Sequence, residues 1–411
     1  MKQLLAVVLV TFCIANAGEG SVYSQFGVGE VMPNARGKNA GMGSVGVGML
    51  GETFINFANP AAIANISRTM LSASYQFRNY NSEDATGSSA INTGNINEFG
   101  LALPLYSPKK IVLALGVLPY SNVGYDQHVD MTVPGSTVAV SQQFEGHGGL
   151  SSAQITLSYL PVTDFYLGAT GHYLFGAIYR DQSFHFNSSS FYSGSYNQTL
   201  SISGFAATLG SIYTGVDKLL GFSQEKKLNI GATLFSGSSL DLDNETLRNF
   251  SSNQDTIQIN NKTMKLPWAF SLGISYLDHS ILYAADITLQ NWSDFKFAGV
   301  HPSEIQNSIQ FGAGIEFLQS NIIADPFWEK VSYRLGGNYR KTNVVLNGQS
   351  INELFAAGGI GFPFSLDSRM NLGIEYGIRG TTSSSLIKDT IIRFTISLTV
   401  SELMFIPPPI D

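Results

Sequence analysis

Cysteine is nearly absent from this sequence, with Cys13 as the single example among 411 residues. Cys13 lies inside an N-terminal stretch that has the three parts of a secretory signal peptide: Lys2, an apolar run from Leu4 to Ile14, and the A-x-A cleavage site at 15–17. We expect residues 1–17 to be removed on export. The exported chain then contains no cysteine, which excludes a fold held by disulfides and a cysteine-ligated metal site.

Charged residues are also scarce, at 13% of the chain against roughly 25% in ordinary soluble domains. After the signal peptide the chain carries 22 basic and 30 acidic residues, a balance that excludes a nucleic-acid-binding protein, which needs a basic face. No stretch there reaches the roughly 18 consecutive apolar residues of a membrane-spanning helix. With 42 glycines and 12% aromatic residues, the composition is typical of a bacterial outer-membrane β-barrel.

Alternating apolar and polar residues supply the strands that such a barrel needs. In Met370–Arg379 one face carries Met, Leu, Ile, Tyr and Ile, and the other carries Asn, Gly, Glu, Gly and Arg. The same alternation recurs in Ser308–Phe317, Val331–Arg340 and Ile392–Ser401. Because side chains of a strand alternate between its two faces, these stretches predict an apolar exterior and a polar interior.

Fourteen stretches of this kind are present, and an even number allows an antiparallel barrel to close. They lie near 70–80, 95–105, 110–125, 138–160, 163–186, 195–213, 226–239, 267–277, 280–291, 305–318, 329–343, 349–362, 367–379 and 387–402. Turns after even-numbered strands are short, such as Pro161-Val162. Those after odd-numbered strands are longer and polar: Asn81–Gly94, Ser239–Lys265 and Asn291–Glu304. Short periplasmic turns and long external loops are the expected asymmetry of an outer-membrane barrel.

The segment ahead of the barrel, residues 18–67, is rich in glycine and apolar residues. Dense glycine allows close-packed backbone, whereas disordered segments have fewer apolar residues. We expect this segment to fill the barrel lumen as a plug, or hatch, with Asn59-Pro60 as a fixed turn. A disordered periplasmic tail is the alternative. The chain then divides into a signal peptide (1–17), a hatch (18–67), an all-β transmembrane barrel (68–403) and a periplasmic tail (404–411).

Four short motifs, spread over nearly the whole chain, point to one known family. Asn59-Pro60-Ala61 lies in the expected hatch, and Tyr23–Gly29 leads into it. Leu115–Ser121 and Tyr376–Thr382 lie in expected strands. Together they resemble the outer-membrane long-chain fatty acid and hydrocarbon transporters of the FadL/TodX type, and in particular a Bacteroidetes branch. That family has a fourteen-stranded barrel with an N-terminal hatch and a characteristic Asn-Pro-Ala.

The resemblance implies passive transport of a hydrophobic small molecule, such as a long-chain fatty acid, across the outer membrane. The ligand would enter an internal pocket, the hatch would rearrange, and the ligand would leave sideways into the lipid beside a kinked strand. The hatch residues assigned to gating are Phe57, Asn59, Pro60 and Ala61. The residues assigned to the kink, in the third strand of the barrel, are Gly116, Pro119 and Gly124. Proline and glycine weaken strand pairing, as a lateral exit requires.

Ionisable residues also fall on the inward face of the expected strands. They are Glu98, His172, Asp286, Glu316, Arg334, Arg340, Glu375, Arg379 and Arg393. Because a guanidinium group binds a carboxylate with two parallel hydrogen bonds, Arg334, Arg340 and Arg379 are candidates for holding a ligand head group. The alternative is that these side chains pair with one another across the lumen or with the hatch.

A scaffold role is the main alternative function, because some relatives of this kind act as carriers or partners in protein secretion. It predicts a bound protein at the external loops or at 319–329, a loop that carries Asp325-Pro-Phe-Trp328. This loop and the short helical turn expected within Gly215–Lys226 could equally be anchors at the membrane interface. A general porin is a third possible function, and an apolar hatch argues against it.

Signals for an enzyme are missing. Glu145-Gly-His147 and Asp278-His279 are the only close acid–histidine pairs, and both lie at strand ends. There is no G-x-S-x-G elbow and no phosphate-binding glycine loop before a helix. Six scattered histidines give no metal-ligand spacing. We therefore expect no catalytic site, metal or cofactor. We also expect the protein to be a monomer.

Overall fold

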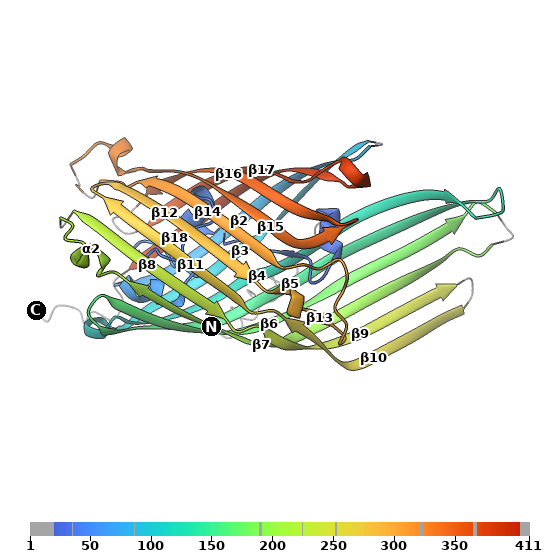
Figure 1. Cartoon of the computed structure of the whole chain (residues 1–411), viewed down its shortest axis with the longest axis horizontal. Helices are drawn as coiled ribbons and strands as arrows, with labels where there is room; N and C mark the ends of the chain where they lie inside the picture. The colour runs from blue at the N-terminus through green and yellow to red at the C-terminus, as the bar shows by residue number, and fades with distance from the viewer. Residues whose placement is uncertain are drawn as a thin grey trace, which may run out of the picture.

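Fourteen antiparallel strands close into a single barrel in the computed structural model (Figure 1). The structure describes residues 20–402 except 35, 86, 189–190, 224, 251–252, 321, 323 and 365–367. The barrel closes where the last strand pairs with the first, Phe394 with Phe77 and Arg393 with Arg78. The predicted strand number is confirmed. The predicted signal peptide and the tail at 404–411 lie outside the described residues.

The barrel strands agree with the fourteen predicted stretches. They are β2 (Thr69–Glu83), β3 (Ser88–Tyr106), β4 (Ile111–Thr132), β5 (Ala139–Val162), β6 (Phe165–Phe186), β7 (Gly194–Tyr213), β8 (Lys226–Phe235), β11 (Ala269–Asp278), β12 (Ile281–Gln290), β14 (Ser308–Phe317), β15 (Ser332–Leu346), β16 (Gln349–Pro363), β17 (Arg369–Gly380) and β18 (Lys388–Glu402). The remaining strands are β1 (Glu30–Val31), β9 (Ser238–Phe250), β10 (Asn253–Leu266) and β13 (Lys296–Phe297). A single helical turn, α2 (Val216–Leu219), forms within Gly215–Lys226, as predicted.

The predicted alternation holds in the structure. In β17, Ile374 and Tyr376 face outward and are about half exposed, at 54% and 52%. Glu375 and Arg379, on the other face, are buried at 1% and 2%. An apolar outer surface is what lipid requires, and closure leaves the barrel's backbone groups paired within the ladder. The molecule is therefore a transmembrane barrel of the bacterial outer-membrane type.

Two of the predicted external loops are strands instead. Most of 81–94 continues β2 and β3, which are joined by only four residues, 84–87. The stretch 239–265 forms the hairpin β9–β10, because Leu240 and Leu242 are buried on one face while Asp241 and Asp243 are exposed on the other. β9 pairs with β7 beyond the point where β8 ends. Polar turn-like residues hid this alternation in the sequence.

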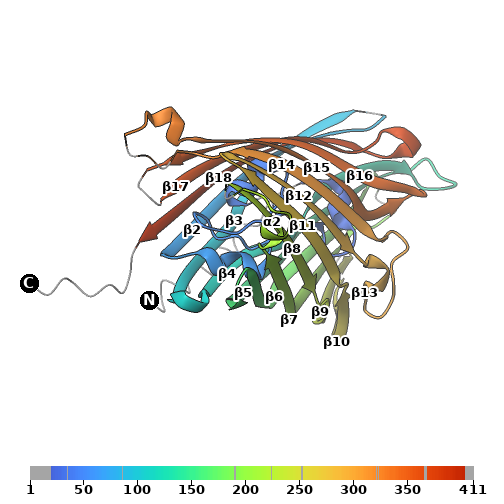
Figure 2. The ribbon, with the colours of Figure 1, turned by 60° about the vertical axis from the view of Figure 1, so that its left-hand side comes forward.

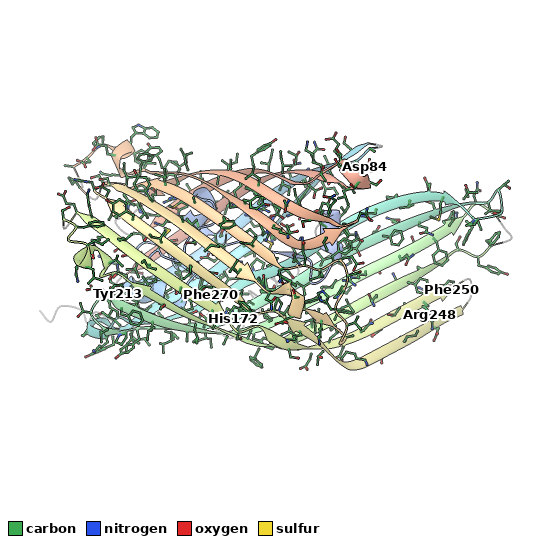
Figure 3. The ribbon with its side chains drawn as sticks, in the orientation of Figure 1. Asp84, His172, Tyr213, Arg248, Phe250 and Phe270 are labelled. Carbon is green, nitrogen blue, oxygen red and sulfur yellow. The ribbon has the colours of Figure 1, made fainter. Side chains whose placement is uncertain are left out.

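On one side of the barrel, the strands extend past the ends of the other strands (Figure 1). We call this part the external extension, formed by residues 120–132, 139–150, 177–186, 194–203, 238–250 and 253–266. In Figure 3, Arg248 and Phe250 mark this extension, whereas Tyr213 lies toward the opposite, short-turn end. The sheet here is open, since β10 pairs with β13 only at Met264 and Lys265.

Residues 20–66 lie inside the barrel, where the blue segment is visible between the strands (Figure 2). This hatch contains η1 (Val22–Gln25), β1, η2 (Gly37–Met42) and η3 (Pro60–Asn65), each a short 3-10 turn or strand. Further 3-10 turns outside it are η4 (Ser107–Lys109), η5 (Trp292–Asp294), η6 (Phe327–Lys330) and η7 (Ser383–Ser385).

Pairs of glycines on neighbouring strands make room for the hatch. We call them the glycine belt: Gly100 with Gly116, Gly168 with Gly210, Gly231 with Gly273, Gly314 with Gly336, and Gly359 with Gly373. A Cβ atom added at any of the ten would come within 3.0 Å of a hatch atom; at Gly231, for example, it would lie 2.1 Å from the carbonyl oxygen of Val47. The hatch therefore packs on the inner wall at a distance that only glycine permits.

We predict that Gly168→Val dislodges the hatch without preventing barrel formation. The new Cβ would lie 2.3 Å from the carbonyl carbon of Pro60, and such overpacking costs about 1–3 kcal/mol or more. Limited proteolysis should then cleave residues 20–66 faster, while heat-modifiable migration of the barrel is retained. Gly171→Val in the same strand is the control, because nothing lies within 4 Å of that position. Equal cleavage of the two variants would contradict the packing role of the belt.

Candidate functional site

Asn59-Pro60-Ala61 joins the hatch to the barrel wall. The Asn59 side chain is fully buried; its oxygen accepts a hydrogen bond from the Ala61 N–H at 3.0 Å and caps η3. Its amide nitrogen donates to the carbonyls of Val47 at 2.8 Å and Ser211 at 3.0 Å. Pro60 begins η3, where its missing N–H has no cost. The motif is thus an anchor on β7, and its role in gating stays a prediction.

Phe57, the other predicted gating residue, lies against the glycine belt. Its ring occupies the space that side chains at Gly100 and Gly116 would fill, since a Cβ at either position would be 2.9 Å from it. Gly100 and Gly116 are paired across β3 and β4. The structure therefore brings Phe57 together with Gly116, a residue predicted for the strand kink.

Pairing between β3 and β4 stops part-way along both strands. The last paired residues are Phe99 and Val117; beyond them β3 pairs only with β2, and β4 pairs with β5. Irregularities fall on each side of the separation, at 97 in β3 and at 120 in β4. Pro119 has no N–H to donate to a ladder. We call this separation the β3–β4 gap, and Gly116 and Pro119 lie at its start.

The hatch takes the place of β3 at the gap. β1 pairs with β4 through Glu30–Asn122 and Val31–Ser121. The Met32 N–H donates to the Tyr120 carbonyl at 3.0 Å, which extends this pairing by one residue. Directly beyond its last pair with β3, the edge of β4 is therefore bound by the hatch.

Gly124, the third predicted kink residue, is bound further along the same edge. The Ser24 hydroxyl donates to the Gly124 carbonyl at 3.0 Å and accepts from its N–H at 2.9 Å. Gly124 therefore serves as a contact for the hatch and lies beyond the start of the gap.

Arg36 of the hatch bridges the two sides of the gap. Its guanidinium donates to the carbonyl of Asn97 in β3 at 3.2 Å and to that of Pro119 in β4 at 2.9 Å. Sequence reasoning missed Arg36, because nothing in its local pattern shows that two strand carbonyls would converge on it. Asn97 and Pro119 present these carbonyls where the ladder between their strands has ended.

The three arginines predicted to hold a ligand head group are engaged by carboxylates. Arg334 binds Glu316 at 2.8 Å, and Arg340 binds Glu353 at 2.8 Å. Arg379 is within 2.6 Å of both Glu353 and Glu30. The structure thus shows the alternative arrangement, in which the arginines pair within the lumen. Their role toward a ligand stays a prediction.

Charges on the hatch complete these ion pairs. Glu30 accepts from Arg379, from Arg393 at 3.2 Å and from the Tyr80 hydroxyl at 3.1 Å. Lys38 binds Glu316 at 2.7 Å, opposite Arg334. Buried ion pairs contribute little net stability, because desolvation offsets their attraction, but loss of one partner is costly. They therefore fix where the hatch sits.

An apolar cluster fills the lumen beside the external extension. Its buried members are Val28, Val123, Tyr125, Leu150, Leu174, Ile178, Leu200, Ile202, Leu240, Leu242, Met264, Leu266, Trp292, Phe295 and Ile305. Tyr120, at the irregularity in β4, packs against them. The predicted loop 291–304 contributes Trp292 and Phe295, which are 1% and 0% exposed, so much of this loop folds inward. We call these residues the external apolar cluster.

The predicted partner loop at 319–329 exposes large apolar side chains at the short-turn end. Phe327 and Trp328 are 50% and 67% exposed, and the Phe327 ring stacks on Phe362. Nearby, α2 carries Lys218, whose ammonium group pairs with Asp164, and this raises the pKa of Lys218. Its role as a partner surface or interfacial anchor stays a prediction.

The described part of the chain contains neither a candidate metal site nor a helix that could span a membrane. Over those residues, no group of three or more His, Cys, Asp or Glu side chains could hold a metal ion. Within the same residues, no helix is long and apolar enough to cross a membrane.

We predict that Glu30→Gln loosens the hatch. The substitution leaves Arg379 and Arg393 without a full counter-charge, and breaking a buried ion pair costs about 3–5 kcal/mol. Hydrogen–deuterium exchange should show a loss of protection of that order in residues 20–36. Asp255→Asn is the control, since it removes the exposed pair with Arg248, which contributes about 0–1 kcal/mol. Unchanged protection in Glu30→Gln would show that the ion pairs do not hold the hatch.

Solved structures with the same architecture are outer-membrane channels of the FadL type. The Pseudomonas putida toluene transporter TodX aligns with a TM-score of 0.63 at 14% identity, over 91% of this chain and 99% of TodX. The monoaromatic hydrocarbon channel CymD aligns with a TM-score of 0.56 at 14% identity, over 92% and 99%. A Pseudomonas aeruginosa FadL homologue gives 0.54 at 12% identity, over 95% and 98%. The fold is therefore that of the FadL-type outer-membrane barrels.

A sequence model of one protein family matches nearly the whole chain. The model described as BamG matches residues 1–408, and the chain belongs to the BamG family. No curated protein sequence matches the chain.

Proposed function

We propose that this protein lets hydrophobic small molecules, such as long-chain fatty acids, pass between the cell exterior and the outer-membrane lipid by way of the β3–β4 gap. The observation that carries the proposal is that β4 at the gap is paired with the hatch and not with its barrel neighbour. A short, two-residue strand can be displaced while the rest of the barrel stays closed. Passage would be passive.

The interior beside the gap suits an apolar molecule. Tyr120 and Val123 belong to β4 near the gap and also contact or form the external apolar cluster. A hydrophobic ligand among these side chains would avoid water in the lumen and could leave directly into lipid. The cluster fills this space in the present conformation, so binding would require the loop at 291–307 or the hatch to shift.

The contacts that would break are few. They are the two residue pairs of β1 with β4, the Met32 bond to Tyr120, the bond from Ser121 to Val28, the two bonds between Ser24 and Gly124, and the two bonds from Arg36. Arg36 is a positioning residue in this proposal, because it ties β3 to β4 through the hatch.

The comparisons support the substrate class in a limited way. TodX and CymD are described as a toluene transporter and a monoaromatic hydrocarbon channel, and both have this fold. At 14% identity the likeness concerns the fold, so we draw the substrate class mainly from the apolar cluster and the gap.

We predict that Arg36→Ala speeds exchange of a hydrophobic ligand. A hydrogen bond from a charged group contributes about 1.5–3 kcal/mol, so the rate constant for release of a fluorescent long-chain fatty acid from purified protein should rise at least about tenfold. Lys109→Ala, in an exposed turn, should leave the rate unchanged. A folded Arg36→Ala protein with the wild-type rate would rule out the gap as the exit.

A scaffold is the second candidate function, and two features favour it. The external extension has an open edge along β10, and exposed strand edges can pair with another chain. Phe327 and Trp328 are exposed at the other end of the barrel. Passage of a small molecule requires neither feature.

Mass spectrometry of protein gently extracted from its own outer membrane distinguishes the two functions. The comparison is between the full chain and a variant lacking residues 21–60. A stoichiometric long apolar molecule in the full chain, absent from the variant, supports passage of hydrophobic molecules. A stoichiometric protein partner with no bound small molecule would replace that proposal with the scaffold.

A further inference from the structure

Two cavities with polar and charged side chains in their linings lie in the lumen on opposite sides of one hatch segment. The external cavity is about 190 Å³ and is lined by wall residues near the external ends of β12, β14 and β15. The periplasmic cavity is about 470 Å³ and is lined near the short turns, by residues that include Leu277, Leu318 and Lys218. No residue of β3 or β4 lines either cavity, although the external cavity includes Val31 and Met32, which bind β4 at the gap, and Trp292 of the external apolar cluster.

The external cavity is built for polar contents. Asn34, Ser44, Asp286 and Asn343 line it, and each has a buried polar atom with no partner among the described residues. A buried polar atom without a hydrogen bond costs about 1–3 kcal/mol, and polar cavities of this size hold water. Both hydrogen-bond donors and acceptors are present, so water and small hydrophilic solutes suit it.

The periplasmic cavity has a lining of both polar and apolar side chains and carries both signs of charge. Lys38, Lys218 and Lys227 lie in its lining together with Glu52 and Glu316. Mixed charge gives little preference for anions over cations. Small ions and neutral solutes could therefore occupy it.

The barrier between the cavities is thin. Ser44 and Val47 line the external cavity, whereas Met49 and Leu50 line the periplasmic one. The chain thus passes from one cavity to the other within Val47–Met49. We call these three residues the septum.

Asp286 of β12 holds the septum against the wall. One carboxylate oxygen accepts from the N–H of Gly46 at 2.6 Å and from that of Val47 at 2.9 Å. Ser275 of β11 donates to the Gly48 carbonyl at 2.8 Å. Bonds to a carboxylate are stronger than neutral ones, so Asp286 makes the strongest wall contact with this segment.

We propose that the two cavities are the halves of an aqueous route for ions and small hydrophilic solutes, closed at the septum by Asp286. Displacement of Val47–Met49 joins the cavities into one polar path through the lumen. This route opens at the septum, whereas the hydrophobic route proposed above opens at the β3–β4 gap, and the solutes of the two routes are of opposite kinds. The opening requires Asp286 to release two backbone N–H groups, and the bonds from Ser275 to Gly48 and from Asn59 to Val47 to break, while Asn59 keeps its bond to β7.

The test is ion conductance of the full chain in planar bilayers with potassium chloride. Wild-type protein should be almost always closed. Asp286→Ala removes both carboxylate bonds, and we expect the ratio of open to closed time to rise about a hundredfold, equivalent to about 2.8 kcal/mol. Asp286→Asn should give a smaller rise, and Asp130→Ala, at an exposed position of β4, should give none.

A second measurement covers the case in which Asp286→Ala does not fold. Ser275→Ala removes the neutral bond to the septum and should raise the ratio of open to closed time less than Asp286→Asn does. Thr288→Cys is then added to the Asp286→Asn and Ser275→Ala variants. It places a thiol in the external cavity of an otherwise cysteine-free exported chain. A water-soluble thiol reagent added on the periplasmic side should label it faster than in the wild-type background.

The outcomes are decisive in either direction. Folded Asp286→Asn and Ser275→Ala barrels with wild-type conductance and labelling would overturn the aqueous route. Raised conductance with unchanged release of the fluorescent fatty acid would support it as separate from the β3–β4 gap. Raised conductance with equally raised fatty-acid release would show that Asp286 opens the hydrophobic route, and would overturn the claim of two routes.

Discussion

The close approach of the hatch backbone to the glycine belt is the constraint on which the rest of the structure depends. The backbone N–H and C=O groups of the wall are already used in the strand ladder, and buried backbone groups need partners. The hatch must therefore satisfy its backbone through bonds within itself, such as Gly51 N–H to the Ala62 carbonyl, and through side chains. Asp286, Ser275 and Asn59 do this at Val47–Met49 and its neighbours, which explains why small polar side chains appear on an otherwise glycine-rich inner surface.

The β3–β4 gap is where the hatch binds wall backbone over a run of residues. With the ladder broken there, the edge of β4 has free groups, and β1, Met32 and Arg36 use them. The hatch is thus held in two ways: by backbone pairing at the gap and by side chains at the septum. The hydrophobic and aqueous routes that we propose correspond to these two kinds of attachment. Each can be loosened by substitutions that leave the other in place.

Charge fixes the position of the hatch between these attachments. Glu30 provides a counter-charge for Arg379 and Arg393, and Lys38 binds Glu316 together with Arg334. Since removing one member of a buried ion pair is costly, a displaced hatch must either keep these contacts or find water for them. This favours local movements of the β1 edge or of the septum over withdrawal of the whole segment from the barrel.

The sequence by itself determined the barrel, because alternation such as that in Met370–Arg379 depends only on which neighbours face lipid. It also pointed to Gly116 and Pro119, since proline lacks an N–H wherever it lies. The hairpin β9–β10 was missed because polar residues masked the alternation around Leu240. Only the tertiary structure decided the parts played by Arg36, Asp286 and the paired glycines. Each depends on which wall residue lies opposite which hatch residue, and that register is set by contacts between segments far apart in the sequence, such as Arg36 with Asn97 and Gly46 with Asp286.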